Sequence, residues 1–269
     1  MATSIPQRLR GVLRPDGRCL VVAMDHALSQ GPARGLENPA ALIETMIGAG
    51  VDAIMTSYGV VKKYGQLISP RVPIIMRIDG GLSARTGTWR EYDDYSLLYS
   101  VEEAAAMGAS AVVVMHFVGA PAEMATLRNL AAAATQCARA GLPLLVESLP
   151  CPHPSFPDLF ATDAIALAAR IAAEHGADFV KCNYSRTVES FRTVVETATV
   201  PVLVLGGERM DSDRAAIELT YGAIAAGAAG VAIGRNIWQS SNPAGMARAL
   251  AAIIHDGASV DDALRIVAG

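Results

Sequence analysis

The feature that most constrains the fold of this chain is a repeated alternation of short apolar runs with longer helix-like segments. Eight apolar runs recur along the 269 residues, and each ends in a polar or glycine-rich stretch. They cover residues 19–24, 52–57, 72–78, 110–117, 142–148, 178–183, 200–207 and 229–235. The runs are continuous and do not alternate with polar residues, which is typical of parallel strands covered on both faces.

The segments between these runs have helical character. Predicted helices cover residues 39–49, 100–107, 120–140, 162–175, 187–198, 211–226 and 242–255, with Asn38 and Thr162 as N-caps of two of them. A glycine stands just before four of the predicted strands, where it can end a helix and open a short loop. These glycines are Gly108, Gly141, Gly176 and Gly227.

This alternation predicts an α/β protein that forms a single (β/α)8 TIM barrel, because such barrels need roughly 250 residues. An open doubly wound sheet is the rival fold, but no G-x-G-x-x-G motif follows the first strand. No linker or break in composition divides the chain, so residues 1–269 are predicted to be one domain. Residues 79–99 are the longest irregular segment and are predicted to form a strand-to-helix loop with a mobile tip.

Composition argues against several classes of protein. Lys and Arg number 22 against 26 Asp and Glu, so neither a nucleic-acid nor a membrane-surface partner is expected. No apolar run reaches the ~18 residues of a transmembrane helix, and residues 1–18 lack the apolar centre of a secretory signal. The four cysteines have no metal-ligand spacing, which favours free thiols in a cytoplasmic protein; no metal and no cofactor is expected.

In a barrel of this kind, chemistry occurs where the strands end. Lys181 ends the sixth run, within GADFVKCNYS, although lysine is rarely buried. An amine kept from water attacks a carbonyl more readily, and the resulting Schiff base withdraws electrons from an adjacent C–C bond. The alternative is a lysine whose ammonium simply reaches water at the strand end.

Three further side chains are catalytic candidates. Asp25 and His26 end the first run, within AMDHALSQG. Asp25 could transfer protons, hold Lys181 as an ammonium or cap the next turn, and His26 could orient that carboxylate. Glu147 ends the fifth run before a proline-rich stretch, and is either an acid/base or the ion-pair partner of Lys181.

The other histidines carry weaker expectations. His153 is predicted to be exposed, and His116 at the end of the fourth run stays open. His175 and His255 are predicted to lie at helix C-termini, where a cation suits the helix dipole.

Glycine turns follow the last two strands. Gly206 and Gly207 end the seventh run, and Gly234 with Arg235 ends the eighth. Backbone N–H groups at such turns often bind phosphate, and an arginine adds a charged clamp. Tight turns without a ligand are the alternative.

Four stretches, AMDHA, DFVKCNY, PVLVLGG and GVAIGRNIWQSSNP, resemble the DeoC/LsrF-type class I aldolases over residues 19–265. This group includes archaeal-type fructose-bisphosphate aldolase and the thiolase LsrF, and the C-terminal run is most similar to the LsrF type. The resemblance implies a TIM barrel with Lys181 as the Schiff-base lysine, Asp25 as an acid/base, and Gly206, Gly207, Gly234 and Arg235 as phosphate-binding turns. It also implies a homo-oligomer, commonly a decamer.

One departure from this family concerns proton transfer. Its fructose-bisphosphate aldolases carry W-x-Y-P after the fifth strand, with the tyrosine as general acid, whereas this chain has Glu147-Ser148-Leu149-Pro150. Leu149 cannot transfer a proton, which argues against sugar-bisphosphate cleavage unless Glu147, His26 or a bound water takes over.

Three functions remain open from sequence. The first is a class I aldolase that forms or breaks a C–C bond of a small phosphorylated ketone or sugar phosphate through Lys181. The second is an LsrF-like thiolase that transfers an acyl group to coenzyme A. The third is a barrel that binds a phosphorylated metabolite without catalysis.

Overall fold

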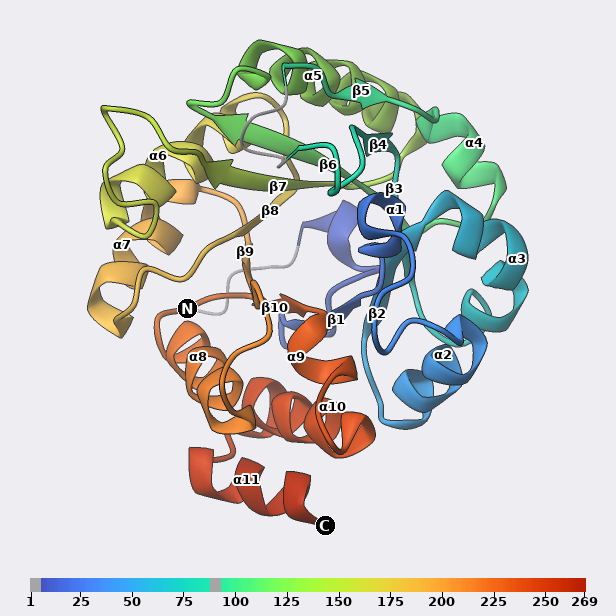
Figure 1. Cartoon of the computed structure of the whole chain (residues 1–269), viewed down its shortest axis with the longest axis vertical. Coiled ribbons are helices and arrows are strands. Elements are labelled where there is room, and N and C mark those ends of the chain that lie inside the picture. Colours follow the sequence, from blue (N-terminus) through green and yellow to red (C-terminus); the bar gives the residue numbers. More distant parts are fainter. Residues whose placement is uncertain (1–5, 88–92) are drawn as a thin grey trace.

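In the computed structural model, which describes residues 6–87 and 93–269, eight parallel strands close into a barrel (Figure 1). They are β1 (Cys19–Ala23), β2 (Ala53–Ser57), β3 (Ile74–Arg77), β6 (Ala111–Val118), β7 (Leu144–Pro150), β8 (Phe179–Cys182), β9 (Val202–Leu205) and β10 (Gly230–Ile233). Their order around the ring follows the chain, and β1 closes the barrel by pairing with β10. The predicted TIM barrel is confirmed, and each predicted apolar run overlaps one barrel strand, although β6 and β7 extend past the ends of their runs.

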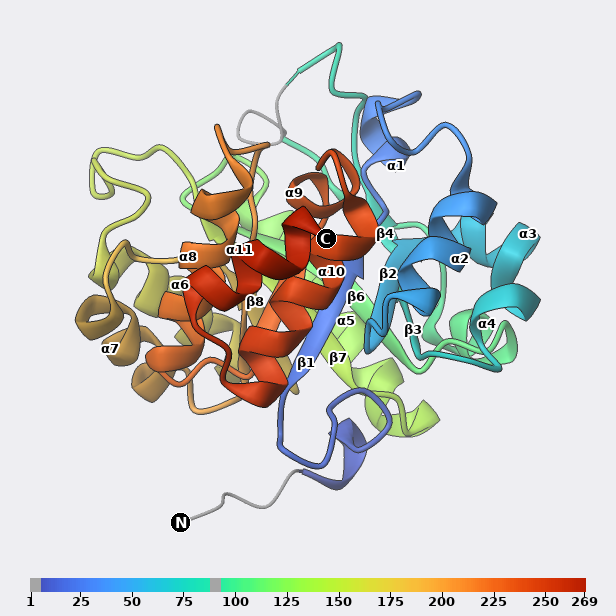
Figure 2. The ribbon, with the colours of Figure 1, turned by 90° about the horizontal axis from the view of Figure 1, so that it is seen from below.

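Alternate side chains of each strand enter two different cores. On β1, Leu20 and Val22 pack outward against the helices, while Val21 and Ala23 face the interior of the barrel. Both faces are therefore buried, which explains why the runs are continuously apolar. The 3₁₀ helix Gln7–Leu9 lies at the amino end of the barrel, opposite α1 and α9 (Figure 2), and Leu9 packs into the interior core from that end.

The helices surround this barrel and follow the strands in turn. They are α1 (Ala27–Gln30), α2 (Pro39–Gly48), α3 (Tyr58–Ile68), α4 (Val101–Ala106), α5 (Glu123–Ala140), α6 (Thr162–Glu174), α7 (Val188–Ala198), α8 (Asp213–Ala225), α9 (Arg235–Trp238), α10 (Pro243–Ala251), the π-helix η2 (Ala252–Asp256) and α11 (Val260–Ala268). The last of these, α11, packs on α8 and α10 outside the ring (Figure 2).

Several helix boundaries differ from the prediction. Asn38 is confirmed as an N-cap and accepts from the amide of Ala41, but Thr162 is the first residue of α6, because Ala161 occupies the cap position. The predicted helix 242–255 ends its α-helical part at Ala251 and continues as a π-helix. The four predicted loop glycines all have positive φ, from 72° to 103°, as a helix end of this type requires.

The segment 79–99 is not wholly irregular. Strand β4 (Asp79–Gly80) pairs antiparallel with β5 (Ser96–Leu97), so the start and end of the loop form a short hairpin. The predicted mobile tip includes residues 88–92, which lie outside the described part of the chain. None of the described helices is long and apolar enough to cross a membrane.

Candidate active site

Lys181 lies on the inner face of the barrel near the carboxyl ends of the strands. It shares that face with Phe179, whereas Val180 and Cys182 face the surrounding helices. The register pairs Lys181 with Glu147 of β7, and the Lys181 Nζ lies 2.8 Å from Glu147 Oε1. Lys181 is only 5% exposed, so its amine is held in the hollow of the barrel and does not extend into solvent.

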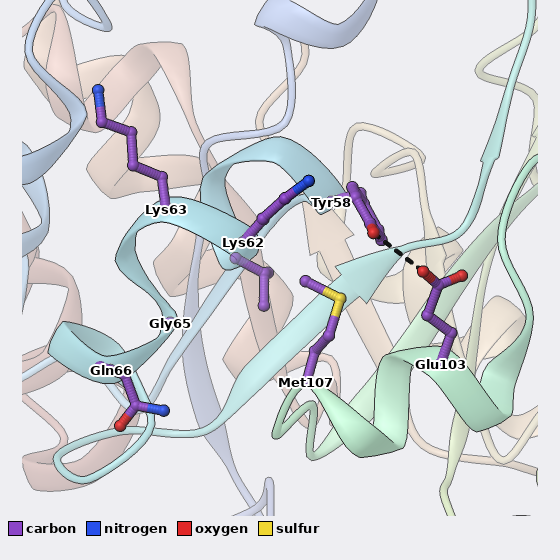
Figure 3. Close-up of a pocket in the computed structure, with 8 residues that line it drawn as sticks. Tyr58, Lys62, Lys63, Gly65, Gln66, Glu103 and Met107 are labelled. Carbon is purple, nitrogen blue, oxygen red and sulfur yellow. Dashed lines mark hydrogen bonds between the residues drawn. The ribbon is translucent and has the colours of Figure 1, made fainter.

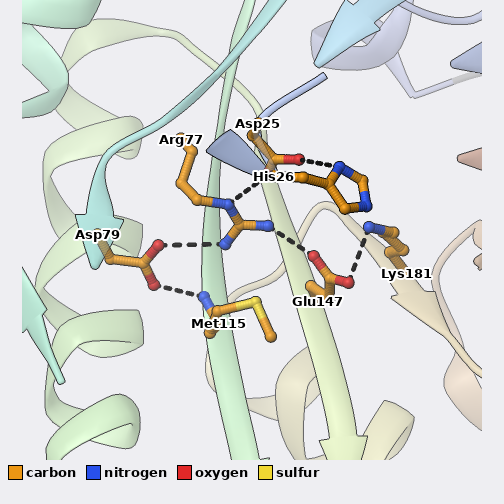
Figure 4. A network of polar contacts seen from close by, with 7 residues as sticks. All are labelled: Asp25, His26, Arg77, Asp79, Met115, Glu147 and Lys181. Carbon is orange, nitrogen blue, oxygen red and sulfur yellow. Dashed lines mark hydrogen bonds and ion pairs between the residues drawn. The ribbon is translucent and has the colours of Figure 1, made fainter. Parts of the chain in front are cut away.

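Arg77 at the end of β3 joins three carboxylates across this hollow (Figure 4). Its Nε lies 2.5 Å from Asp25 Oδ2, and its two terminal nitrogens lie 2.6 Å from Glu147 Oε2 and 3.2 Å from Asp79 Oδ1. Glu147 therefore bridges the guanidinium and the amine of Lys181. The carboxylate in direct contact with Lys181 is Glu147, while Asp25 is bound to Arg77.

The charges in this network shift the pKa values of its acids in different directions. Burial by itself would raise the pKa of Asp25 and of Glu147, but the positive charges of Arg77 and Lys181 outweigh it, so both pKa values are lowered. For Asp79 burial prevails over Arg77 and the Met115 N–H, and raises the pKa to about 6. Asp25 and Glu147 are thus ionised at neutral pH, and Asp79 is the first of the three to take up a proton on acidification.

His26 lies beside the network but is held less tightly. Its Nδ1 is 3.6 Å from Asp25 Oδ1 and has no hydrogen-bond partner among the described residues. Burial lowers the pKa of His26, and the negative charge of Asp25 offsets this only in part, so the imidazole is neutral at pH 7. A neutral ring next to a carboxylate can accept a proton as well as orient a ligand.

The two predicted glycine turns lie next to each other and are joined by Asn236. Its side-chain amide donates to the carbonyls of Gly206 and Glu208 at 2.9 Å each, and its oxygen accepts from the amide of Met210. Gly207 has φ +64°, which favours glycine. The turn after β9 is therefore fixed by a side chain from the turn after β10.

Gly234 lies where the chain passes close to β1. A Cβ at this position would come within 2.6 Å of the Ala23 carbonyl oxygen and of the His26 ring, so only glycine fits. Arg235 follows at the start of the short helix α9, and its buried Nε has no hydrogen-bond partner within the described residues. The glycine turns, Arg235 and His26 thus border the same side of the barrel mouth, an arrangement that suits an anionic group.

Other predicted or possible site features lie elsewhere. His116 is fully buried and bonds through Nδ1 to Ser148 Oγ, which in turn donates to Ala168 of α6, so it belongs to the layer between barrel and helices. His153 is exposed, as predicted. Among the described residues no group of three or more His, Cys, Asp or Glu is placed to hold a metal ion.

A cavity of about 310 Å³ lies on the outer side of the barrel, between α3 and α4 (Figure 3). Tyr58 donates to Glu103 across it at 2.9 Å, and Lys62 and Met107 also line it. None of the network residues lines this cavity, so it is separate from the candidate active site.

Arg77 lies in the predicted strand 72–78 and Asp79 begins the segment 79–99, and neither was assigned a role from the sequence. Their signal was a charged residue near the end of an apolar run, Arg77, with a second charged residue, Asp79, directly after that run, and its meaning depends on the residues opposite. Asn236, which joins the glycine turns, was also missed. A closed parallel barrel with a buried amine and ionised carboxylates at the carboxyl ends of its strands defines a class of lysine-dependent barrel lyases.

Comparison with known proteins identifies the family. The DeoC/LacD family aldolase model matches residues 19–240, and the chain belongs to this family. The class 1 fructose-bisphosphate aldolase of Thermoproteus tenax is 32% identical over 257 residues, covering 93% of this chain and 94% of that protein. An uncharacterized aldolase of Saccharolobus solfataricus is also 32% identical, over 262 residues and with the same coverage. The chain is a class I aldolase, a carbon–carbon lyase that acts through a lysine Schiff base.

Solved structures agree with this assignment. The crystal structure of an archaeal fructose 1,6-bisphosphate aldolase is 30% identical, with a TM-score of 0.84 over 93% of this chain and 99% of that one. A second archaeal structure, at TM-score 0.83, 30% identity and coverage of 92% and 98%, has its catalytic lysine covalently bound to the carbinolamine intermediate of the substrate.

Proposed function

We propose that this enzyme forms or breaks a C–C bond of a small phosphorylated ketone through a Schiff base on Lys181. The observation that carries the proposal is the buried contact of 2.8 Å between the Lys181 amine and Glu147. A carboxylate at this distance can take the ammonium proton and leave a neutral amine, which attacks the ketone carbonyl. The Thermoproteus tenax relative and the two archaeal structures above are aldolases of fructose bisphosphate, which supports a phosphorylated substrate.

Each network residue has a role in this proposal. Glu147 returns its proton to the carbinolamine hydroxyl, which leaves as water and yields the iminium. Asp25 assists this step from the other side of the hollow, and Arg77 keeps both carboxylates ionised and oriented. His26 lies beside Asp25 as a neutral imidazole and can accept a proton.

The phosphate is assigned to Gly206, Gly207, Gly234 and Arg235. The support is the joined pair of turns, the unpartnered Nε of Arg235 and the close packing that excludes a side chain at Gly234. We further propose that residues 1–269 act as one domain, in a homo-oligomer and in the cytoplasm. The net charge of −4 supports a small-molecule substrate without a nucleic-acid or membrane partner.

The test is to incubate the enzyme with dihydroxyacetone phosphate, reduce with borohydride and map the adduct by peptide mass spectrometry. A reduced adduct on Lys181 is expected, with none in Lys181→Met. A ketone that binds without forming an adduct would contradict the Schiff-base role of Lys181, as would a Lys181→Met enzyme that still turns over. Release of an acyl-coenzyme A from a phosphorylated diketone would instead favour the thiolase reaction.

A further inference from the structure

The aldol step needs a proton donor in addition to the two ionised carboxylates that lie closest to Lys181 and Arg77. When the enamine carbon attacks an aldehyde, the aldehyde oxygen becomes an alkoxide and must be protonated. Asp25 and Glu147 are ionised and bound to Arg77, and Glu147 also faces Lys181. The donor should therefore lie above this layer, nearer the mouth of the barrel.

The next layer of inward-facing residues is an apolar wall. Register pairs Phe117 of β6 with Leu149 of β7, two residues beyond the pair Met115 and Glu147 and so about 6–7 Å higher along the strands. Tyr95 packs into this cluster of Met115, Phe117, Ala120, Leu149 and Cys151. It is the member of the cluster that carries a hydroxyl group, and the thiol of Cys151 turns toward the carbonyl of Leu149.

Tyr95 is fixed in this wall by three independent constraints. It directly precedes β5, whose pairing with β4 anchors the chain beside Asp79. The Asn129 side chain of α5 donates to the Tyr95 carbonyl at 2.6 Å. The Tyr95 ring meets the Phe117 ring edge to face, with centroids 5.2 Å apart and planes at 85°. These contacts fix the position of the Tyr95 side chain, although Tyr95 belongs to a loop.

The charges of the network also shift the pKa of the Tyr95 phenol. Burial raises the pKa of Tyr95, the negative charges of Asp79, Glu147 and Asp25 raise it further, and Arg77 offsets this in part. These four charged groups belong to the network around Lys181, and Tyr95 packs with Met115 and Leu149 in the layer directly above it. The phenol stays protonated at neutral pH, as a donor to a strongly basic alkoxide must.

We propose that Tyr95 is the catalytic residue that protonates the aldehyde oxygen during C–C bond formation and takes that proton back during cleavage. In condensation, the enamine carbon bonds to the aldehyde carbon, the carbonyl π electrons move to oxygen, and that oxygen takes the phenol proton. The products of this step are an iminium on Lys181 and a phenolate. Hydrolysis of the iminium releases one proton, which restores the phenol. Tyr95 thus supplies from the loop after β3 the proton transfer that Leu149 cannot perform.

The test rests on the proposed function and separates the two steps. Tyr95→Phe removes only the hydroxyl, and Tyr99→Phe is the matched control, because Tyr99 lies in the same loop but stacks on Tyr58 at 4.1 Å. Each variant is assayed for the borohydride adduct with dihydroxyacetone phosphate, and for condensation of that ketone with a panel of free and phosphorylated aldehydes of two to four carbons.

Tyr95→Phe should keep the adduct yield and the KM for the ketone within about twofold, while kcat for condensation falls about 10²- to 10³-fold. Tyr99→Phe should match the wild type in both assays. The proposal is overturned if Tyr95→Phe condenses within about threefold of the wild type, if it loses adduct and kcat together, or if a wild-type enzyme that forms the adduct condenses no aldehyde. A wild type without any adduct overturns the Schiff-base function itself, and Tyr95 with it.

Discussion

The barrel holds an ion network at each end, and the two networks are built differently: the one at the carboxyl end is buried, whereas Arg14 and Asp16 of the one at the amino end are exposed. At the carboxyl end, Arg77, Lys181 and three carboxylates contact one another mainly through side chains. At the amino end, Asp52 accepts from the amide of Leu20 at 2.6 Å and Asp16 accepts from that of Arg18 at 2.9 Å. His255 joins these two carboxylates at 2.8 Å and 2.7 Å, and Arg14 also pairs with Asp52.

This difference indicates what each network does. The amino-end network joins backbone segments that are far apart in the chain: the N-terminal turn, the start of β2 and the π-helix η2. Its charged groups are bound to one another and to backbone amides of these segments. We therefore infer that this network stabilises the fold. The carboxyl-end network faces the hollow, and its Lys181 and Glu147 can exchange a proton when a substrate enters. Four substitutions test this division.

The largest effect is expected for Arg77→Met. Loss of the guanidinium leaves three carboxylates in the hollow without their common partner, which should lower the free energy of unfolding by about 3–5 kcal/mol. Denaturant titration measures this cost. Because Arg77 lowers the pKa of Asp25 and of Glu147, both pKa values should rise and turnover should fall as well. A variant as stable as the wild type would contradict the role of Arg77 as the centre of the network.

Glu147→Gln should separate activity from stability. The amide keeps the shape of the carboxyl but cannot take the proton of Lys181, so kcat should fall by roughly 10²-fold or more. Comparison of pH–rate profiles shows whether the lost group is an acid/base. The stability change should be smaller than that of Arg77→Met, since Asp25 and Asp79 still pair with the arginine. Unchanged turnover would reassign Glu147 to a purely structural ion pair.

Asp52→Asn is the counterpart at the amino end. It weakens the contacts to Arg14 and His255 and should cost about 1–3 kcal/mol of stability. Turnover per folded molecule should stay within about twofold of the wild type, because Asp52 lies at the opposite end of the barrel. A loss of turnover without loss of stability would mean that the two networks are coupled.

The smallest effect is expected for His255→Gln, and it depends on pH. Burial would lower the pKa of His255, but the hydrogen bonds to Asp52 and Asp16 outweigh it and raise the pKa above 6.5. The stabilisation by protonated His255 is therefore complete below pH 6.5 and is lost as pH rises through the raised pKa. The variant should lose about 1 kcal/mol at pH 6 and less at pH 9. Thermal unfolding of the variant and the wild type at several pH values measures this difference. A loss of the same size at every pH would contradict the titration of His255.

Sequence predicted the barrel and its strand ends because both depend on local patterns. A continuous apolar run that stops at a polar residue marks a buried strand and its carboxyl end, so the sequence places Lys181, Glu147 and Asp25 at strand ends, where the structure joins them in one network. Helix α3 was missed because Gly59 and Gly65, together with valines, give its segment a weak helical preference. The N-cap of α6 was placed one residue late, at Thr162, because threonine is a better cap than the alanine actually used.

The missing parts of the site depend on contacts between distant segments. Arg77 is identifiable at a strand end, and its partner Asp79 is only two residues away. The other two partners of Arg77, Asp25 after β1 and Glu147 of β7, are distant in the chain, and the closed barrel brings them to Arg77. Tyr95 lies in a loop without periodicity, so no local pattern marks it. His255 was interpreted as a cation at a helix end, whereas its partners, Asp16 and Asp52, are more than 200 residues away in the chain.

Arg77 pairs with Asp25 and Glu147 across the interior of the barrel, and these contacts limit how the enzyme could be divided or assembled. If the chain were cut within α5, the first half would retain Arg77, Asp25 and Tyr95, and the second would retain Glu147 and Lys181. The first half would contain Arg77 and the proposed proton donor Tyr95 but would lack the nucleophile Lys181. The second half would contain Lys181 but would lack the guanidinium of Arg77. Neither fragment could be an ancestral aldolase of this design on its own, and reassociation of the two halves should restore adduct formation only when the ring closes.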